Sequence, residues 1–272
     1  MSLNKICISI ISDEKYEKYI PYFIYFITKS YPTYHIKILF LGNLSKKIKS
    51  LIDYIDNPLV TIEENFFKNA PTSNQELKSI RWLLPEKTFN NFEYVYIGDV
   101  DLLICKEDSS LLEQHTTHIE KSNIPYSNCI RPNTNRLTGL HFFKVKEYYK
   151  YMNDIIKEYI KKINDKKFKF KSGYRNEHFL YDIIKKGIGE LPKDENRIDV
   201  GGSGPHHGLH LGIWRNTHKV KKLQKDRIIR DSYKDHFDFY NGVKKEKTFL
   251  YLKEKLPLKE FSNMEKFFNT IK

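Results

Sequence analysis

The sequence contains few cysteines and no apolar run long enough to cross a membrane. Its 272 residues include three cysteines, Cys7, Cys105 and Cys129, which are odd in number and widely spaced. Such spacing is typical of neither a disulfide framework nor a zinc site. The longest apolar stretches, residues 6–11 and 20–27, are far shorter than a membrane-spanning helix. We therefore expect a protein of a reducing compartment.

Two further features are missing, a secretion leader and an interdomain linker. The N-terminus has no charged leader followed by an apolar segment and a small-residue cleavage site. No stretch is rich enough in proline, glycine and serine to separate two domains. We predict a cytoplasmic protein with one domain over residues 1–218 and a basic helical C-terminal extension over residues 219–272.

The charge balance is strongly basic. Lysine and arginine total 47 against 34 aspartates and glutamates, and the cations are dense in residues 157–171 and 219–230. Such segments attract nucleic acid, an anionic membrane surface or phosphorylated substrates. Lysine, isoleucine, asparagine and tyrosine are all abundant and share A/T-rich codons, so compositional bias is an equal alternative. Charge alone does not choose between these explanations.

Apolar residues alternate between strand spacing and helix spacing along the first hundred residues. We predict strands over 5–11, 34–41, 59–62 and 92–97 and helices over 15–29, 45–56 and 75–84. Further along, a less regular stretch precedes a strand over 140–145 and helices over 147–167 and 175–186. This order predicts an α/β fold with a central mixed, mainly parallel sheet flanked by helices, and ligands bind such sheets at the carboxyl ends of the strands.

Two aspartates follow the apolar strand at 92–97. Asp99 and Asp101 would project to the same side if the chain stays extended, because strand geometry has a period of two. Paired carboxylates at a strand end suit Mg²⁺ or Mn²⁺ holding a substrate's phosphates. A polar strand end or a turn is the alternative. Ser12 and Asp13 follow the first predicted strand, so both pairs should lie at the same edge of the sheet.

A glycine- and histidine-rich segment occupies residues 201–212. Its histidines, His206, His207 and His210, are possible metal ligands near neutral pH, and its glycines permit close backbone approach to a ligand. The segment matches neither a P-loop nor a dinucleotide-binding pattern. Arg215, which follows Trp214, is suited to bind a diphosphate, although an ordinary surface arginine is an equal alternative.

In this order along the chain, the motifs resemble GT-A-type glycosyltransferases. The nearest likeness is to retaining enzymes of the glycogenin-like, lipopolysaccharide-galactosyltransferase-like and blood-group-transferase-like kinds. The resemblance spans roughly residues 5–215 and rests on Lys-x-x-Arg at 78–81, Asp-Val-Asp at 99–101, Thr-Gly-Leu-His-Phe-Phe at 138–143, Asn-Glu-His-Phe-Leu at 176–180 and His-Leu-Gly-Ile-Trp-Arg at 210–215. The last element is shorter than in those families, and Arg215 stands where they carry a lysine.

The resemblance implies a single GT-A, Rossmann-like domain and metal-dependent transfer of a sugar from a nucleoside diphosphate sugar, by default a UDP-sugar. The acceptor would be a glycan or a lipid-linked sugar in surface polysaccharide synthesis. Asp99, Asp101 and His210 would hold Mn²⁺ or Mg²⁺, with His207 as the alternative imidazole. The basic C-terminal region would then hold the enzyme at the inner face of an anionic membrane.

The resemblance also implies which residues contact the donor. Glu177 would act near the anomeric carbon, as nucleophile or stabilising carboxylate in a retaining enzyme or as base in an inverting one. Its alternative is a carboxylate that merely favours a helix N-terminus. The remaining expected donor contacts are Ile10, Ser12, Asp13, Arg81, Thr138, Gly139 and Arg215.

Other functions fit the sequence less well. A haloacid-dehalogenase-type phosphatase carries its Asp-x-Asp after the first strand, and a nucleotidyltransferase needs Gly-Ser ahead of its carboxylates; here Gly202-Ser203 follows them. Lysines interleaved with aromatics near 166–174 suit nucleic-acid binding, but no nucleic-acid module is recognisable. We therefore expect no nucleic-acid partner.

Overall fold

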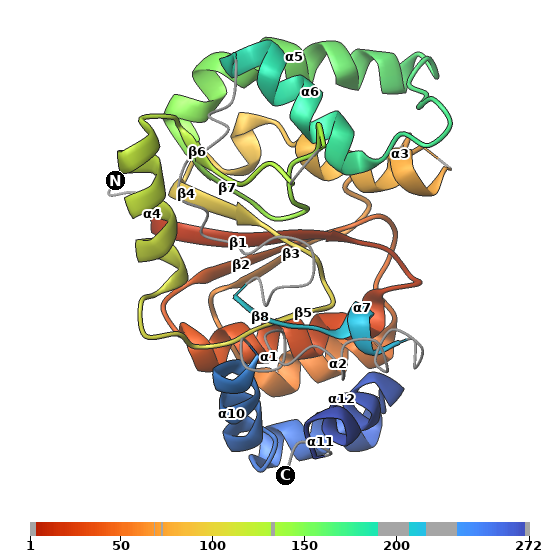
Figure 1. The fold of residues 1–272 in the computed structure, drawn as a ribbon. Helices are drawn as coiled ribbons and strands as arrows, with labels where there is room; N and C mark the ends of the chain where they lie inside the picture. The colour runs from red at the N-terminus through yellow and green to blue at the C-terminus, as the bar shows by residue number, and fades with distance from the viewer. Residues whose placement is uncertain are drawn as a thin grey trace.

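The centre of the fold is a six-stranded sheet of order β3-β2-β1-β4-β7-β6 (Figure 1). The first four strands in this order are parallel, whereas β7 runs antiparallel to both β4 and β6. This confirms the predicted mixed, mainly parallel sheet. The strands are β1 (Asn4–Ser12), β2 (His35–Phe40), β3 (Val60–Glu63), β4 (Phe92–Ile97), β6 (Tyr126–Ser127) and β7 (His141–Lys144). The computed structural model describes residues 4–67, 69–71, 73–131, 134–189, 207–215 and 233–269.

Helices cover both faces of the sheet (Figure 1). Central parallel strands are buried on both faces and therefore read as continuous apolar runs. In β1, Ile8 and Ile10 pack into the apolar cluster that contains α1, and Cys7 packs into the cluster on the opposite face. The helices α1 (Ile20–Ser30) and α2 (Lys46–Ile55) lie on one face; α3 (Asn74–Ser79), α5 (Val145–Asn164) and α6 (Asn176–Ile188) lie on the other.

Helix boundaries follow local chemistry. Ser45, Ser73 and Ser110 cap α2, α3 and α4 (Leu111–Ser122), each accepting a hydrogen bond from a backbone N–H three residues later. Two predicted helices are shorter than expected because single 3₁₀ turns form part of them. The turn η1 (Glu17–Tyr19) precedes α1, and η2 (Ile80–Trp82) follows α3; another turn, η3 (Glu86–Thr88), precedes β4.

Three C-terminal helices pack below α1: α10 (Lys234–Val243), α11 (Lys247–Lys255) and α12 (Lys259–Asn269). They share the apolar cluster of α1, where the rings of Tyr22 and Phe261 are 4.8 Å apart. The Tyr22 hydroxyl also donates to the carbonyl of Leu256 at 2.7 Å. The predicted domain boundary at 218/219 and the basic run at 219–230 lie outside the described residues.

A second, two-stranded sheet was not predicted. Here β5 (Leu102–Ile104) pairs antiparallel with β8 (Gly208–His210), and the short helix α7 (Leu211–Trp214) follows. Glycine is required at 208 because a Cβ there would lie 1.9 Å from the Leu103 carbonyl oxygen. The pairing therefore depends on a close backbone approach that other residues would prevent.

The chain does not stay extended after β4, as the spacing of the aspartates had suggested. Leu102 N–H donates to the Asp99 carbonyl at 3.1 Å, which closes a turn between β4 and β5. The two aspartates are brought together by this turn and not by strand alternation.

None of the helices in the described ranges combines the length and the apolar character needed to cross a bilayer.

The buried His141 makes stability depend on pH. Its side chain lies among the rings of Trp82, Tyr126 and Tyr148, and its Nδ1 accepts from the Asn128 amide at 3.1 Å. Burial lowers the pKa of His141 to about 3. Between that value and the ordinary pKa of histidine, near 6.5, the unfolded chain binds the extra proton, so stability falls as the pH falls through this range.

We predict that replacing His141 with phenylalanine removes part of this acid sensitivity. Urea unfolding between pH 7 and pH 4 should show the wild-type chain losing about 3 kcal/mol more than His141→Phe over that interval. The comparison concerns the slope and not the absolute stability, because the substitution also removes the Asn128 hydrogen bond. Parallel pH profiles for the two proteins would contradict the assignment.

Candidate functional site

A cavity of about 410 Å³ opens at the carboxyl ends of the central parallel strands. Ser12 and Asp13 enter it from the end of β1, and Asp99 and Asp101 from the turn after β4. The late segment contributes His210 and Arg215, and the starts of α3 and α6 complete the wall. The cavity therefore brings together the two strand ends that the sequence motifs had marked, the end of β1 and the end of β4.

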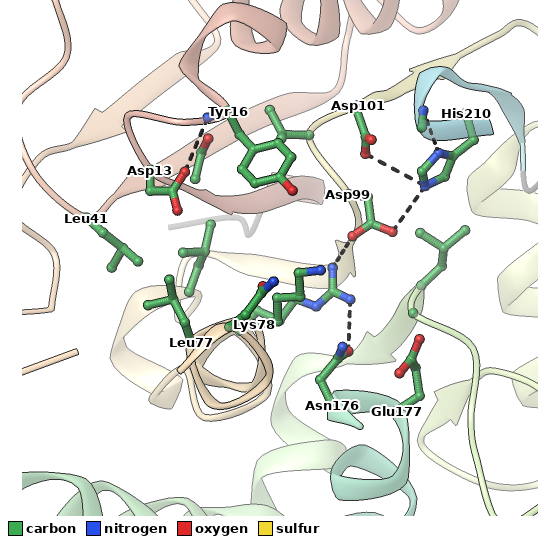
Figure 2. A pocket seen from close by; sticks show the side chains of 18 of the residues that line it. Asp13, Tyr16, Leu41, Leu77, Lys78, Asp99, Asp101, Asn176, Glu177 and His210 are labelled. Atoms are coloured by element: carbon green, nitrogen blue, oxygen red, sulfur yellow. Dashed lines mark hydrogen bonds and ion pairs between the residues drawn. The ribbon is translucent and has the colours of Figure 1, made fainter. Parts of the chain in front are cut away.

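The β5–β8 pairing places His210 beside the two aspartates. His210 is directly opposite Leu102 in the ladder, and the backbone N–H of Leu211 donates to the Asp101 carbonyl at 2.7 Å. Nε2 of His210 lies 3.5 Å from Oδ2 of Asp99 and 3.7 Å from Oδ1 of Asp101 (Figure 2). One imidazole nitrogen thus faces both carboxylates.

Each aspartate also has an arginine partner. Arg81, from η2, forms an ion pair with Asp99 and donates to the Gly98 carbonyl at 3.3 Å and to the Asn176 side-chain oxygen at 3.3 Å. On the other side, Nη2 of Arg215 lies 2.6 Å from Oδ2 of Asp101. Two guanidinium groups from distant segments therefore neutralise the carboxylate pair.

The electrostatics follow from these contacts. Burial raises the pKa of Asp99, but the Arg81 guanidinium and the His210 imidazole outweigh it and hold that pKa well below the usual range. Burial opposes the charged form of His210, but Asp101 and Asp99 raise its pKa to about 9. The Gly212 N–H, which donates to Nδ1 at 3.1 Å, opposes this effect, because Nδ1 accepts only in the neutral imidazole. In that form the ring proton is on Nε2 and faces the aspartates. A cation bound at Nε2 would replace this proton.

The donor set fits a divalent metal ion in type and spacing. Carboxylate oxygens suit Mn²⁺ and Mg²⁺, and an imidazole beside them favours the transition metal, Mn²⁺. Ligand atoms about 2.1 Å from one ion and about 90–120° apart are roughly 3.0 to 3.6 Å from each other, close to the distances from His210 to the aspartates. The described residues contain no preformed cluster of three or more His, Cys, Asp or Glu side chains able to hold a metal. Binding would therefore require Asp99 and Asp101 to exchange their arginine partners for the ion.

Glu177 lies at the far end of the cavity, in the first turn of α6 (Figure 2). Its Oε2 is buried and has no hydrogen-bond partner among the described residues. The N-terminus of α6 is capped by His178 instead, whose Nδ1 accepts from the Arg175 N–H at 3.1 Å. Glu177 thus lines the cavity, with one carboxylate oxygen buried beneath its surface.

The other expected donor contacts divide into two groups. Ser12, Asp13, Arg81, Gly139 and Arg215 line the cavity. Ile10 and Thr138 do not.

The reasons for these two exclusions are local. Ile10 is fully buried against α1, and its neighbour Ile11 points the opposite way, into the cavity, as strand alternation requires. Thr138 is buried, and its hydroxyl donates to Asn128 Oδ1 at 2.7 Å. Ile11 therefore lines the cavity where Ile10 was expected, and of the expected pair Thr138 and Gly139 only Gly139 lines it.

His207, the alternative metal ligand, belongs to a different cluster. Its Nδ1 lies 2.7 Å from Glu107, and its Nε2 lies 3.1 Å from Nε2 of His115. Glu107 also contacts His236 of α10 at 2.9 Å. Burial raises the pKa of Glu107, but His207 and His236 reverse this and lower it to about 2. His207 does not line the cavity, and His206 and the rest of 201–206 lie outside the described residues.

Several lining residues were not predicted as donor contacts. Lys78 lies one helical turn before Arg81, and this spacing on one helix face was the available signal. Leu41 and Leu77 lie on the same side as Asp13 (Figure 2). Nothing in the local sequence distinguishes Arg131 from other arginines, and only the folded chain brings it to the cavity.

Comparisons with known proteins bear on the fold. No family model and no curated protein matches the sequence. Similar solved structures include the bifunctional glycosyltransferase WbbM, 14% identical, with a TM-score of 0.48, over 93% of this chain and 52% of that one. This chain thus spans about half the length of WbbM.

Two other similar structures contain bound ligands. The galactosyltransferase LgtC, in complex with donor and acceptor sugar analogues, is 12% identical, with a TM-score of 0.40, over 66% of this chain and 69% of that one. The mannosyltransferase PcManGT from Pyrobaculum calidifontis, in complex with GDP-Man and Mn²⁺, is 10% identical, with a TM-score of 0.41, over 98% of this chain and 75% of that one. These neighbours are nucleotide-sugar glycosyltransferases, the class that the sequence motifs resemble. Because their TM-scores are below 0.5, the function proposed below depends on the geometry of the cavity.

Proposed function

We propose that this protein is a metal-dependent glycosyltransferase that moves a sugar from a nucleoside diphosphate sugar to a glycan or lipid-linked acceptor. One observation carries the proposal: His210 lies directly beside Asp99 and Asp101 in a cavity at the strand ends. Guanidinium groups lie beside both carboxylates, and the carboxylate of Glu177 lies at the far end. This set suits a diphosphate joined to a sugar.

The cavity has distinct surroundings for the parts of such a donor. Apolar Leu41 and Leu77, next to Asp13, offer a surface for the nucleoside (Figure 2). Lys78 and the two arginines surround the central region with positive charge. Asn176 and Glu177 lie at the other end, where the sugar would extend (Figure 2).

The residues of this chain would stabilise the departing nucleoside diphosphate. Asp99, Asp101 and His210 would hold Mn²⁺ or Mg²⁺, which when bound supplies Lewis-acid stabilisation of negative charge. Once released from the aspartates, the fixed guanidinium groups of Arg81 and Arg215 can donate to phosphate oxygens. Their charge is in place before the bond to the sugar breaks, so little reorganisation is needed.

Glu177 is the proposed carboxylate at the anomeric centre. The residue lines the cavity, and Oε2 is buried without a partner among the described residues, so the carboxylate can reach the sugar through its other oxygen. The motif order resembles retaining enzymes, and we propose that the anomeric configuration is kept, with Glu177 as nucleophile or stabilising carboxylate. The donor base is proposed to be uracil on the same resemblance.

Metal-dependent nucleotide binding is the first prediction. In a thermal-shift panel of UDP, GDP, ADP, CDP and TDP, we expect UDP to raise the melting temperature with Mn²⁺ present and to lose most of that effect with EDTA, because ligands of the native state stabilise it. Asp101→Asn should abolish the shift. The matched control is Asp154→Asn, on the exposed surface of α5, where the aspartate side chain is 97% accessible. A wild-type response in Asp101→Asn would refute the metal scheme.

Glu177→Gln separates binding from chemistry. We expect this variant to bind UDP and Mn²⁺ with wild-type affinity, because the nucleotide does not reach Glu177, and to lose at least about 100-fold in transfer rate. Released nucleoside diphosphate measures the rate and also distinguishes transfer from phosphatase or nucleotidyltransferase chemistry. Proton NMR of the product reports the anomeric configuration. Full activity in Glu177→Gln would remove this residue from the mechanism.

A membrane-linked acceptor is the finer proposal for biological role. The excess of cations would place the enzyme at the cytoplasmic face of an anionic membrane, beside lipid-linked precursors of surface polysaccharide. Co-sedimentation with vesicles containing phosphatidylglycerol should retain the protein at low salt and release it at about 0.5 M salt, where the Debye length is only a few ångströms. Neutral vesicles are the control. Equal retention by neutral and anionic vesicles, or none by either, would contradict the proposal.

A further inference from the structure

Arg215 is held by the C-terminal helix α12. Its Nε donates to the Tyr19 hydroxyl at 3.0 Å and lies 3.4 Å from Oε1 of Glu260, the second residue of α12. The Tyr19 hydroxyl in turn donates to the same Glu260 oxygen at 2.6 Å. These contacts between Arg215, Tyr19 and Glu260 therefore connect the cavity to the C-terminal helix α12.

The surroundings of Arg215 restrict it further. Its guanidinium carbon lies 4.8 Å from the centre of the Tyr19 ring and 5.3 Å from that of Tyr16, both within cation–π range. The backbone before it is tied to the same helix, because the Asn263 amide donates to the Trp214 carbonyl at 2.9 Å. Glu260 is 2% exposed, and its partners among the described residues are this arginine and Tyr19.

The carboxylates of Asp101 and Glu260 contact different nitrogens of the Arg215 guanidinium. Asp101 contacts Nη2 from the cavity side, and Glu260 contacts Nε from the protein side. When Asp101 turns to a metal ion, as the proposed function requires, Glu260 and Tyr19 still hold Nε. The terminal nitrogens are then free to donate to a diphosphate without loss of the arginine's position.

We infer that Glu260 is a positioning residue for donor binding, which keeps Arg215 directed into the cavity when Asp101 releases it. The inference rests on the proposed function. It also gives the C-terminal helices a role beyond packing, because the site is complete only when α12 is in place.

The test is a double-mutant cycle with Glu260→Gln, Arg215→Met and the double variant. Glu260→Gln keeps the shape of the side chain and an acceptor for Tyr19 but removes the charge that holds Arg215. The matched control is Glu265→Gln in the same helix. Glu265 likewise accepts from a tyrosine, Tyr240 at 2.7 Å, and pairs with Lys253 at 3.4 Å. Neither of these partners lines the cavity, whereas Arg215, the partner of Glu260, does.

Two quantities are measured for each variant: the affinity for UDP with Mn²⁺ by calorimetry, and stability in urea without ligand. We expect Glu260→Gln to weaken UDP binding about 10-fold, the effect of losing one charged hydrogen bond, and Glu265→Gln to leave it unchanged. In Arg215→Met, adding Glu260→Gln should cost no further affinity. The stability cycle should show coupling between Glu260 and Arg215 without any nucleotide.

The outcomes separate the two claims. Unchanged UDP affinity in Glu260→Gln beside normal wild-type binding, or additive effects in the stability cycle, would overturn the role of Glu260 alone. Equal losses of affinity in Glu260→Gln and Glu265→Gln would show a general destabilisation of α12 and would also overturn it. If the wild-type chain binds none of the five nucleoside diphosphates, the proposed function fails, whatever coupling the stability cycle shows.

Discussion

The site depends on the antiparallel pairing of β5 with β8. This short ladder brings residues 208–210 against the segment that follows the turn with Asp99 and Asp101, and it sets His210 opposite Leu102. Gly208 permits the approach, because any side chain there would collide with the Leu103 carbonyl. Without the ladder, Asp99 would keep its ion pair with Arg81, but the imidazole and Arg215 would have no fixed place beside Asp101.

Charge balance makes this arrangement stable before any ligand binds. Two adjacent carboxylates in a partly buried site are costly unless cations accompany them, and Arg81 and Arg215 provide the positive charge. The same cations are those that a diphosphate would need. When a ligand binds, the aspartates would exchange the arginines for a metal ion, and the arginines would exchange the aspartates for the diphosphate. No charged group is then left without a partner of opposite charge.

The C-terminal helices are integrated with the α/β part of the molecule. Their aromatic side chains share a cluster with α1, and Glu260 reaches the cavity wall through Tyr19. On the opposite side of β8, Glu107 joins His207 to His236 of α10. These contacts explain why a segment read from sequence as a basic extension is structurally continuous with the site.

The sequence by itself determined the order of strands and helices from β1 to β4 and from β7 to α6, because apolar periodicity reflects burial directly, but it did not reveal β5, α4, β6 or β8. It also marked Asp99, Asp101, His210 and Arg215 by residue type and order. Only the tertiary structure decided which histidine faces the aspartates, since His207 and His210 are equivalent donors until β8 pairs with β5. It also decided the roles of Ile11, Lys78 and Glu260. Their contacts come from segments distant in the chain, and long-range contacts leave no periodic signal in the sequence.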